Sequence, residues 1–187
     1  MVAVGRGSGV ETSALLNPMD QPLGRTAGNA LEVAECVEVL RGGGPEDLIE
    51  LTLDLASRLV PAKKEQLRSR LADGSAWQKF IAMVEAQGGD AATLEKMREV
   101  HRAPIITDLP ALSRGTLTSL DALEIGRLCV ELGAGRAKAG DSVDFSVGVE
   151  CLKKEGDAVE RGEPIVRVHS RQPIDSAVAA KRIMVIA

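Results

Sequence analysis

Apolar residues recur at helical spacing through most of the first hundred residues of the chain. This spacing predicts a helix over residues 30–41, a second helix from Pro45 to about Leu59, and a third that begins at Ser75. A highly charged helix after Pro61 separates the second from the third. Gly42-Gly43-Gly44 followed by Pro45 marks the boundary between the first two helices, because glycine ends helices and proline begins them. The first half of the chain is therefore predicted to be helix-rich.

The large apolar side chains define which helix faces are buried. In the second helix we expect one buried face, formed by Leu48, Leu51, Leu55 and Leu59. In the helix that begins at Ser75, residues at positions i, i+3, i+4 and i+7 form a core stripe of Trp77, Phe80, Ile81 and Val84. An aromatic stripe at this spacing is more often core than cofactor pocket. A short helix after Asp90 carries two further apolar residues, Leu94 and Met97.

Strand patterns dominate after about residue 105. Alternating apolar residues predict strands at 116–120, 141–152 and 164–169, and a last strand at 182–186 ends the chain. Asp121 is predicted to cap a helix between the first two of these strands, and an Ala-rich helix precedes the last. One earlier strand is predicted at Val10–Leu16, which Asn17-Pro18 would end.

The change of pattern predicts two parts, a helix-rich part at residues 1–105 and a strand-rich part at residues 106–187. The fold class is α/β (α+β). We expect the first part to belong to a large α/β domain and the second to be a small C-terminal domain.

A polar turn runs from Met19 into the first predicted helix. Asn29 is the predicted N-cap of that helix, and Glu32 and Glu35 lie in its first turns, where the helix dipole favours a carboxylate. Near the N-terminus, the glycine cluster Gly5–Gly9 is interpreted as the end of a helix. A phosphate-binding loop would need a strand before the glycines and a helix after them, and here the order is reversed.

Composition excludes several functions. The net charge is −4 and the aromatic residues are one Trp, two Phe and no Tyr, so we expect no binding to nucleic acid or to an anionic membrane. The three cysteines form no CxxC pair, which argues against a disulfide framework or a zinc site. No signal peptide or long apolar run is present, and the predicted location is cytoplasmic. The two histidines, His101 and His169, have no catalytic neighbours in sequence and are interpreted as structural.

The segment Lys154–Ile165 contains a Gly-Asp-x-Val-x-x-Gly-Glu-Pro pattern. This pattern resembles the turn before a strand in biotinyl and lipoyl carrier domains. The tripeptides that present a modifiable lysine, Met-Lys-Met or Asp-Lys-Ala, are absent. The resemblance therefore implies a hammerhead or barrel-sandwich-hybrid architecture for the C-terminal domain, without the carrier function.

Several blocks resemble thymidine and pyrimidine-nucleoside phosphorylases, in family order and over nearly the whole chain. The blocks are Gln21-Pro22-Leu23-Gly24, Gly28-Asn29-Ala30-Leu31-Glu32-Val33, Leu40-Arg41-Gly42-Gly43-Gly44-Pro45-Glu46-Asp47-Leu48, Gln87-Gly88-Gly89-Asp90, Leu132-Gly133-Ala134-Gly135-Arg136 and Asp144-Phe145-Ser146-Val147-Gly148. The resemblance covers the later part of the family's α/β domain and its C-terminal domain. It implies transfer of a pentosyl group: inorganic phosphate, the co-substrate, attacks C1′ of a pyrimidine nucleoside and releases the base and (deoxy)ribose 1-phosphate.

The family's phosphate-binding Lys-His-Ser-x-Gly-Gly loop does not occur in this sequence, nor does its helical lobe with the base-binding residues. No catalytic or substrate-binding residue can therefore be carried over. One site can be carried over. The resemblance implies a potassium-like cation held by carbonyl oxygens of Leu23 and Thr26 and by the carboxylate of Glu35. Loop carbonyls and a carboxylate suit a hard cation. The alternative is that Glu35 is a solvated or dipole-satisfying helix residue.

Two hypotheses follow. In the first, the chain is a C-terminal fragment of such a phosphorylase, from a truncated, split or cleaved gene product, and is inactive alone. Its partner would be an N-terminal phosphorylase half, or a second copy through self-association at an exposed strand edge. In the second, the chain is a non-catalytic binding or scaffolding module that retains the family fold.

Overall fold

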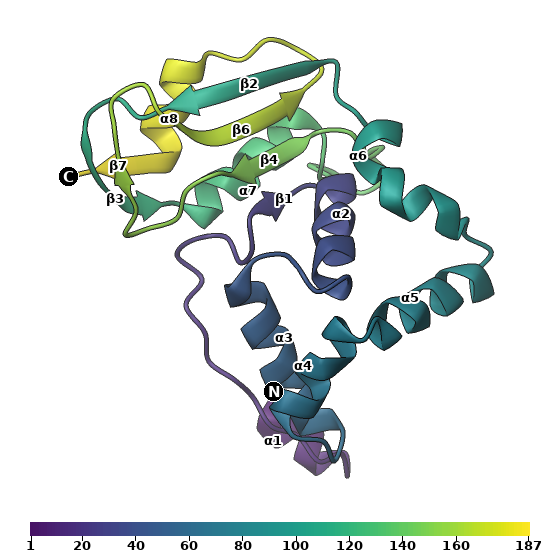
Figure 1. Ribbon diagram of the computed structural model, residues 1–187. Helices are drawn as coiled ribbons and strands as arrows, with labels where there is room; N and C mark the ends of the chain where they lie inside the picture. Colours follow the sequence, from purple (N-terminus) through teal and green to yellow (C-terminus); the bar gives the residue numbers. More distant parts are fainter.

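The computed structural model describes all residues 1–187 and shows a helical part below a layer of strands (Figure 1). The elements up to residue 100 are α1 (Val2–Gly7), β1 (Thr26–Ala27), α2 (Asn29–Leu40), α3 (Glu46–Leu59), α4 (Lys64–Ala72), α5 (Ser75–Ala86), the 3-10 helix η1 (Ala91–Lys96) and α6 (Met97–Val100). The later elements are β2 (Ile105–Pro110), β3 (Gly115–Leu120), α7 (Ala122–Leu132), β4 (Gly148–Cys151), β5 (Ala158–Val159), β6 (Pro164–Ser170), α8 (Ser176–Ile183) and β7 (Met184–Ile186).

Two antiparallel sheets form the strand layer. The larger sheet has the strand order β1-β4-β6-β2, and the smaller one has the order β5-β3-β7. β1 comes from the helix-rich part of the chain, yet it pairs with β4, so that Thr26 faces Glu150 and Ala27 faces Val149. Helices together with antiparallel sheets confirm the predicted mixed fold class and the small strand-rich domain at the C-terminal end.

The main hydrophobic core lies between these sheets and helices α7 and α8. Its sixteen buried residues are almost all aliphatic, as the shortage of aromatic residues requires, and several, such as Leu109, Val149 and Val168, have no exposed surface. No helix is long and apolar enough to cross a membrane.

Two smaller cores stabilise the helical part. In one, the predicted stripe of α5 is confirmed: Trp77 is buried against Val37 and Leu94, with partly buried apolar neighbours around it. In the other, Ile49 and Leu53 of α3 pack against Val39 of α2.

The leucine face predicted for α3 is wrong in its second half. Leu55 is 48% exposed and Leu59 is 85% exposed, whereas Ile49 and Leu53, one turn apart, point into the core. The partly buried Leu67 and Leu71 pack against that core, so the buried face of α3 is the one that carries Ile49 and Leu53. The last turn of α3 is left uncovered.

The strand predicted at Val10–Leu16 is also wrong. Residues 10–19 run without regular secondary structure from α1 to the turn before β1 (Figure 1), and Leu16 is 99% exposed. No backbone hydrogen bond joins residues 11–19 to another segment. A strand is stabilised by a hydrogen-bonded neighbour, and this segment has none. The glycines at positions 5 and 7 lie within α1, in keeping with the helical interpretation of that cluster.

The strand predicted at 141–152 is shorter than expected, because only Gly148–Cys151 pairs in the sheet. Before it, the Asp144 carboxylate accepts hydrogen bonds from the backbone N–H and the hydroxyl of Ser146, at 2.9 and 2.7 Å. An aspartate that bonds the backbone two residues ahead favours a turn over a strand. The predicted alternation therefore ends in a loop, and Phe145 is 54% exposed.

Candidate functional site

Residues Asp20–Ala27 form a turn that enters the sheet and then α2; we call this segment the 20–27 turn. Gly28 follows it as the N-cap of α2, and its N–H donates to Glu32 Oε1 at 2.8 Å. Asn29, the predicted cap, is instead the first residue of the helix, and its Nδ2 donates to the carbonyl of Ala134 at 2.9 Å. The helix begins one residue earlier than predicted because a glycine with φ of 134° makes the sharp entry.

The Glu35 carboxylate lies beneath the 20–27 turn and is only 4% exposed. Oε1 accepts from the N–H of Arg25 at 2.8 Å, and Oε2 accepts from the hydroxyl of Thr26 at 3.1 Å. The turn fits this closely around the carboxylate only with glycine at position 24, where a Cβ would lie 2.4 Å from Glu35 Oε2 and φ is +65°. Burial raises the pKa of Glu35, and the hydrogen bonds from Arg25 and Thr26 act against that rise.

The structure joins Thr26 to Glu35 through a hydrogen bond between their side chains, whereas the predicted ligands at Leu23 and Thr26 are backbone carbonyls. Thr26 is 7% exposed, whereas the Leu23 side chain is 46% exposed at the surface of the turn. The solvated alternative for Glu35 does not hold, because the carboxylate is buried in the second turn of α2. No group of three or more His, Cys, Asp or Glu side chains is placed to hold a metal ion. Any cation here would depend on backbone carbonyls and one carboxylate.

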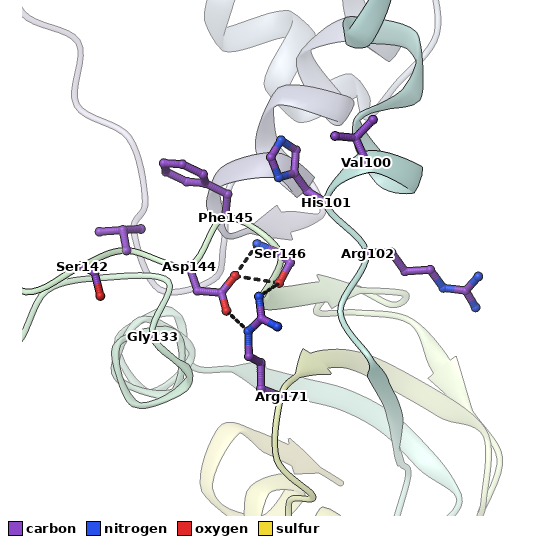
Figure 2. A pocket seen from close by; sticks show the side chains of 10 residues that line it. Val100, His101, Arg102, Gly133, Ser142, Asp144, Phe145, Ser146 and Arg171 are labelled. Carbon is purple, nitrogen blue, oxygen red and sulfur yellow. Dashed lines mark hydrogen bonds and ion pairs between the residues drawn. The ribbon is translucent and has the colours of Figure 1, made fainter.

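A cavity of about 540 Å³ lies elsewhere, between the end of α6 and the loop before β4 (Figure 2). On one side, the rings of His101 and Phe145 meet edge to face with their centroids 6.0 Å apart. On the other side, Arg171 pairs with Asp144 and approaches the Ser146 hydroxyl at 3.4 Å.

The two charged side chains at the centre of this cavity, Arg171 and Asp144, form an ion pair with each other. The hydrogen bond from Arg171, together with those from Ser146, lowers the pKa of Asp144 to about 2. The Arg102 guanidinium points away from this cluster (Figure 2). The cavity is therefore a polar hollow whose central acid and base already satisfy each other.

His169 lies in β6, where it is 8% exposed and its Nε2 is 2.8 Å from Glu150 Oε2. Arg98 of α6 pairs with the same carboxylate. The hydrogen bond with His169, followed by that with Arg98, lowers the pKa of Glu150 to about 2. This group ties the sheet to the helical part, in line with the structural interpretation of His169.

Sequence comparison places this fold in a known class. Residues 116–185 match the family model described as pyrimidine nucleoside phosphorylase C-terminal domain. The match covers nearly all of the smaller sheet, helices α7 and α8, and strands β4 and β6 of the larger sheet. Over these residues the strand-rich part of the chain is similar to that domain.

The similarity extends beyond that domain. The chain is 40% identical to a pyrimidine-nucleoside phosphorylase of Bacillus subtilis (strain 168) over 96% of its length, and 38% identical to those of Staphylococcus haemolyticus over 95% and Geobacillus stearothermophilus over 94%. It spans 43–44% of the length of these three relatives. The chain is related to the C-terminal portion of the pyrimidine-nucleoside phosphorylases.

Two features of the 20–27 turn were not predicted from the sequence. Asp47 and Lys154 both contact it, although they are 107 residues apart. The only sequence signal was that Asp47 lies in a block that resembles the phosphorylases and Lys154 in the segment that resembles carrier domains.

Proposed function

We propose that the chain forms the C-terminal part of a pyrimidine-nucleoside phosphorylase, an enzyme that uses inorganic phosphate to release the base and (deoxy)ribose 1-phosphate from a pyrimidine nucleoside. The relatives, both named pyrimidine-nucleoside phosphorylases, support the reaction class. The observation that carries the proposal is the buried Glu35 carboxylate enclosed by the 20–27 turn, within a segment that resembles the family.

In this proposal the 20–27 turn is one wall of a site for a potassium-like cation. The carbonyls of Leu23 and Thr26 and the carboxylate of Glu35 supply oxygen ligands, which a hard cation prefers. Without a cation, burial raises the pKa of Glu35. A bound cation would favour the ionised carboxylate and offset that effect.

The remaining ligands and the phosphate- and base-binding groups would come from polypeptide that corresponds to the N-terminal portion of the relatives. This sequence contains no Lys-His-Ser phosphate loop, so we expect no phosphorolysis by the chain alone. The exposed apolar residues Val10, Leu16 and Met19 support association with such a partner or with a second copy. The proposal includes a cytoplasmic location, which the three free cysteines favour.

The test combines the purified chain with the N-terminal portion of the Bacillus subtilis relative, produced separately, and measures release of thymine or uracil. We expect no release by either polypeptide alone and phosphate-dependent release by the mixture, stimulated by K⁺ over choline at equal ionic strength. A mixture with the Glu35→Gln chain is the matched control and should lose the K⁺ stimulation.

Two outcomes would contradict the proposal. Turnover by the chain alone would show that the missing groups are not required. Failure of the two polypeptides to associate, with no activity, would favour a non-catalytic binding or scaffolding module instead.

A further inference from the structure

The 20–27 turn is bonded to the C-terminal domain along its length. The carbonyl of Asp20 accepts from the N–H of Ala122 at 2.9 Å, and the carbonyl of Arg25 accepts from the N–H of Cys151 at 2.6 Å. β1 then pairs with β4 in the larger sheet. The C-terminal domain therefore supports the outer side of the turn, opposite Glu35 in α2.

Lys154 makes the most specific of these contacts. Its Nζ donates to the carbonyl of Pro22 at 2.5 Å and to Asp47 Oδ2 at 3.0 Å. The same Asp47 oxygen accepts from the N–H of Gly24 at 3.1 Å. Lys154 belongs to the turn between β4 and β5 and Asp47 to the first turn of α3, so these two segments meet the 20–27 turn at this point.

The charges of this group reinforce one another. Partial burial acts to raise the pKa of Asp47, but the hydrogen bonds and the charge of Lys154 outweigh it and the pKa is lowered. The Lys154 side chain is 25% exposed and that of Asp47 is 44% exposed. Hydrogen bonds between an ammonium and a carboxylate are stronger than neutral ones, which favours a fixed arrangement at this partly covered place.

This arrangement controls a particular carbonyl. In a planar trans peptide, the C=O of one residue and the N–H of the next point in opposite directions. The peptide between Leu23 and Gly24 has its N–H held by Asp47, so the Leu23 carbonyl is turned away from Asp47. The next peptide has its N–H held by Glu35. Two carboxylates on different helices thus fix two consecutive peptide planes of the turn.

We propose that Lys154 is a positioning residue: by holding Asp47 and the Pro22 carbonyl, it fixes the orientation of the Leu23 carbonyl, so that the C-terminal domain shapes the cation wall. The proposal rests on the proposed function as far as the cation is concerned. The positioning of the turn itself can be measured without a cation.

The experiment compares Lys154→Met with Lys153→Met in the full chain. Lys153 is the adjacent residue and pairs with Glu163 at 2.6 Å, away from the 20–27 turn, so its variant controls for loss of a lysine from the same β4–β5 connection. Amide hydrogen exchange is followed by NMR at Gly24 and Arg25, with the amides of β6 as an internal reference. K⁺ affinity is taken from the K⁺ dependence of base release by each chain mixed with the N-terminal portion of the Bacillus subtilis relative, with choline chloride keeping the ionic strength equal.

We expect Lys154→Met to speed exchange at Gly24 at least tenfold, to leave exchange in β6 within twofold of the unaltered chain, and to weaken K⁺ binding at least fivefold. Lys153→Met should change none of these, and Lys154→Arg should recover part of the protection. Asp47→Asn removes the partner charge at nearly constant shape, so it should act in the same direction as Lys154→Met.

Exchange at Gly24 within twofold of the unaltered chain in both Lys154→Met and Asp47→Asn would overturn the positioning role. Faster exchange throughout β6 would overturn it as well, because Lys154 would then act on global stability. If the mixture with the N-terminal portion of the Bacillus subtilis relative shows no K⁺ stimulation while Lys154→Met frees Gly24, the cation function is refuted and the positioning of the turn is supported.

Discussion

Replacing Gly148 by alanine tests the contact that joins the 20–27 turn to the sheet. Gly148 is the first residue of β4 and faces the end of β1. A Cβ at this position would lie 2.4 Å from the carbonyl oxygen of Ala27, 3.0 Å from Gly28 Cα and 3.0 Å from Leu31 Cδ1. Two of these neighbours are backbone atoms, which cannot move aside as a flexible side chain would.

The cost follows from this geometry. An ordinary contact of the Cβ begins at 3.4 Å, so β1 and β4 would have to separate by about 1 Å. Overpacking of this kind costs ~1–3 kcal/mol. The separation would also weaken the hydrogen bonds between β1 and β4, each worth ~1 kcal/mol. We therefore expect Gly148→Ala to lower the free energy of unfolding by about 4 kcal/mol.

Urea unfolding followed by circular dichroism measures this change. Gly126→Ala is the matched control, because Gly126 lies inside α7 with nothing within 4 Å of its Cβ position. Alanine in a helix interior should raise the free energy of unfolding by ~0.5–1 kcal/mol. If Gly148→Ala stays within about 1 kcal/mol of the unaltered chain, the close packing of β1 on β4 is not a determinant of stability and the reasoning is refuted.

Three further predictions concern titrating groups. Because burial raises the pKa of Glu35, the native state takes up the Glu35 proton at a higher pH than the unfolded chain does. Without K⁺, the unfolding free energy should therefore rise, relative to that of Glu35→Gln, as the pH falls from 7 toward 4.5. A difference between the two proteins that stays constant with pH in urea titrations would contradict this. Glu150 has its pKa lowered from 4.5 to about 2, so its stabilisation should be present above pH 4.5 and lost as the pH falls toward 2; acid titration of Glu150→Gln should show a smaller loss. Burial raises the pKa of Cys129 to about 11 and that of Cys151 to about 12, whereas Cys36 is exposed. Iodoacetamide should therefore label Cys36 first, as followed by mass spectrometry. Equal labelling rates at all three cysteines would contradict the structure.

Periodicity predicted the helices of this chain well because each carries its own apolar face. The core stripe of α5 was correct, since Trp77 on its apolar face is buried against Val37 of α2 and Leu94 of η1. The uncovered end of α3 was not predictable in the same way. Leu55 and Leu59 continue the leucine spacing, yet both are exposed, because the core that α3 shares with α2 and α4 forms around Ile49 and Leu53.

The strands were harder because a strand depends on its neighbours. Val10–Leu16 has the composition of a buried strand but no partner in this chain, and it stays extended and exposed. β1 shows the reverse case, since two residues with no strand pattern of their own pair with β4. Glu150, which faces Thr26, lies 124 residues later in the chain. The boundary near residue 105 rests on composition alone and stays a prediction.

Helical spacing alone already indicated that Glu35 lies on the buried face of α2. It lies four residues after Leu31, which is 4% exposed, so it belongs to the buried face of α2 and not to the acidic outer face. A carboxylate on a buried face conflicts with the apolar pattern around it, and such conflicts concentrate at functional sites. The structure shows what the conflict achieves: the carboxylate fixes the peptide before Arg25, while Asp47 and Lys154 fix the one before Gly24. A buried charge that serves only to hold a turn could be replaced by a neutral amide at little cost. A charge that binds a cation could not be replaced by a neutral amide without loss of cation binding. The K⁺ response of Glu35→Gln therefore separates a role in holding the turn from a role in binding the cation.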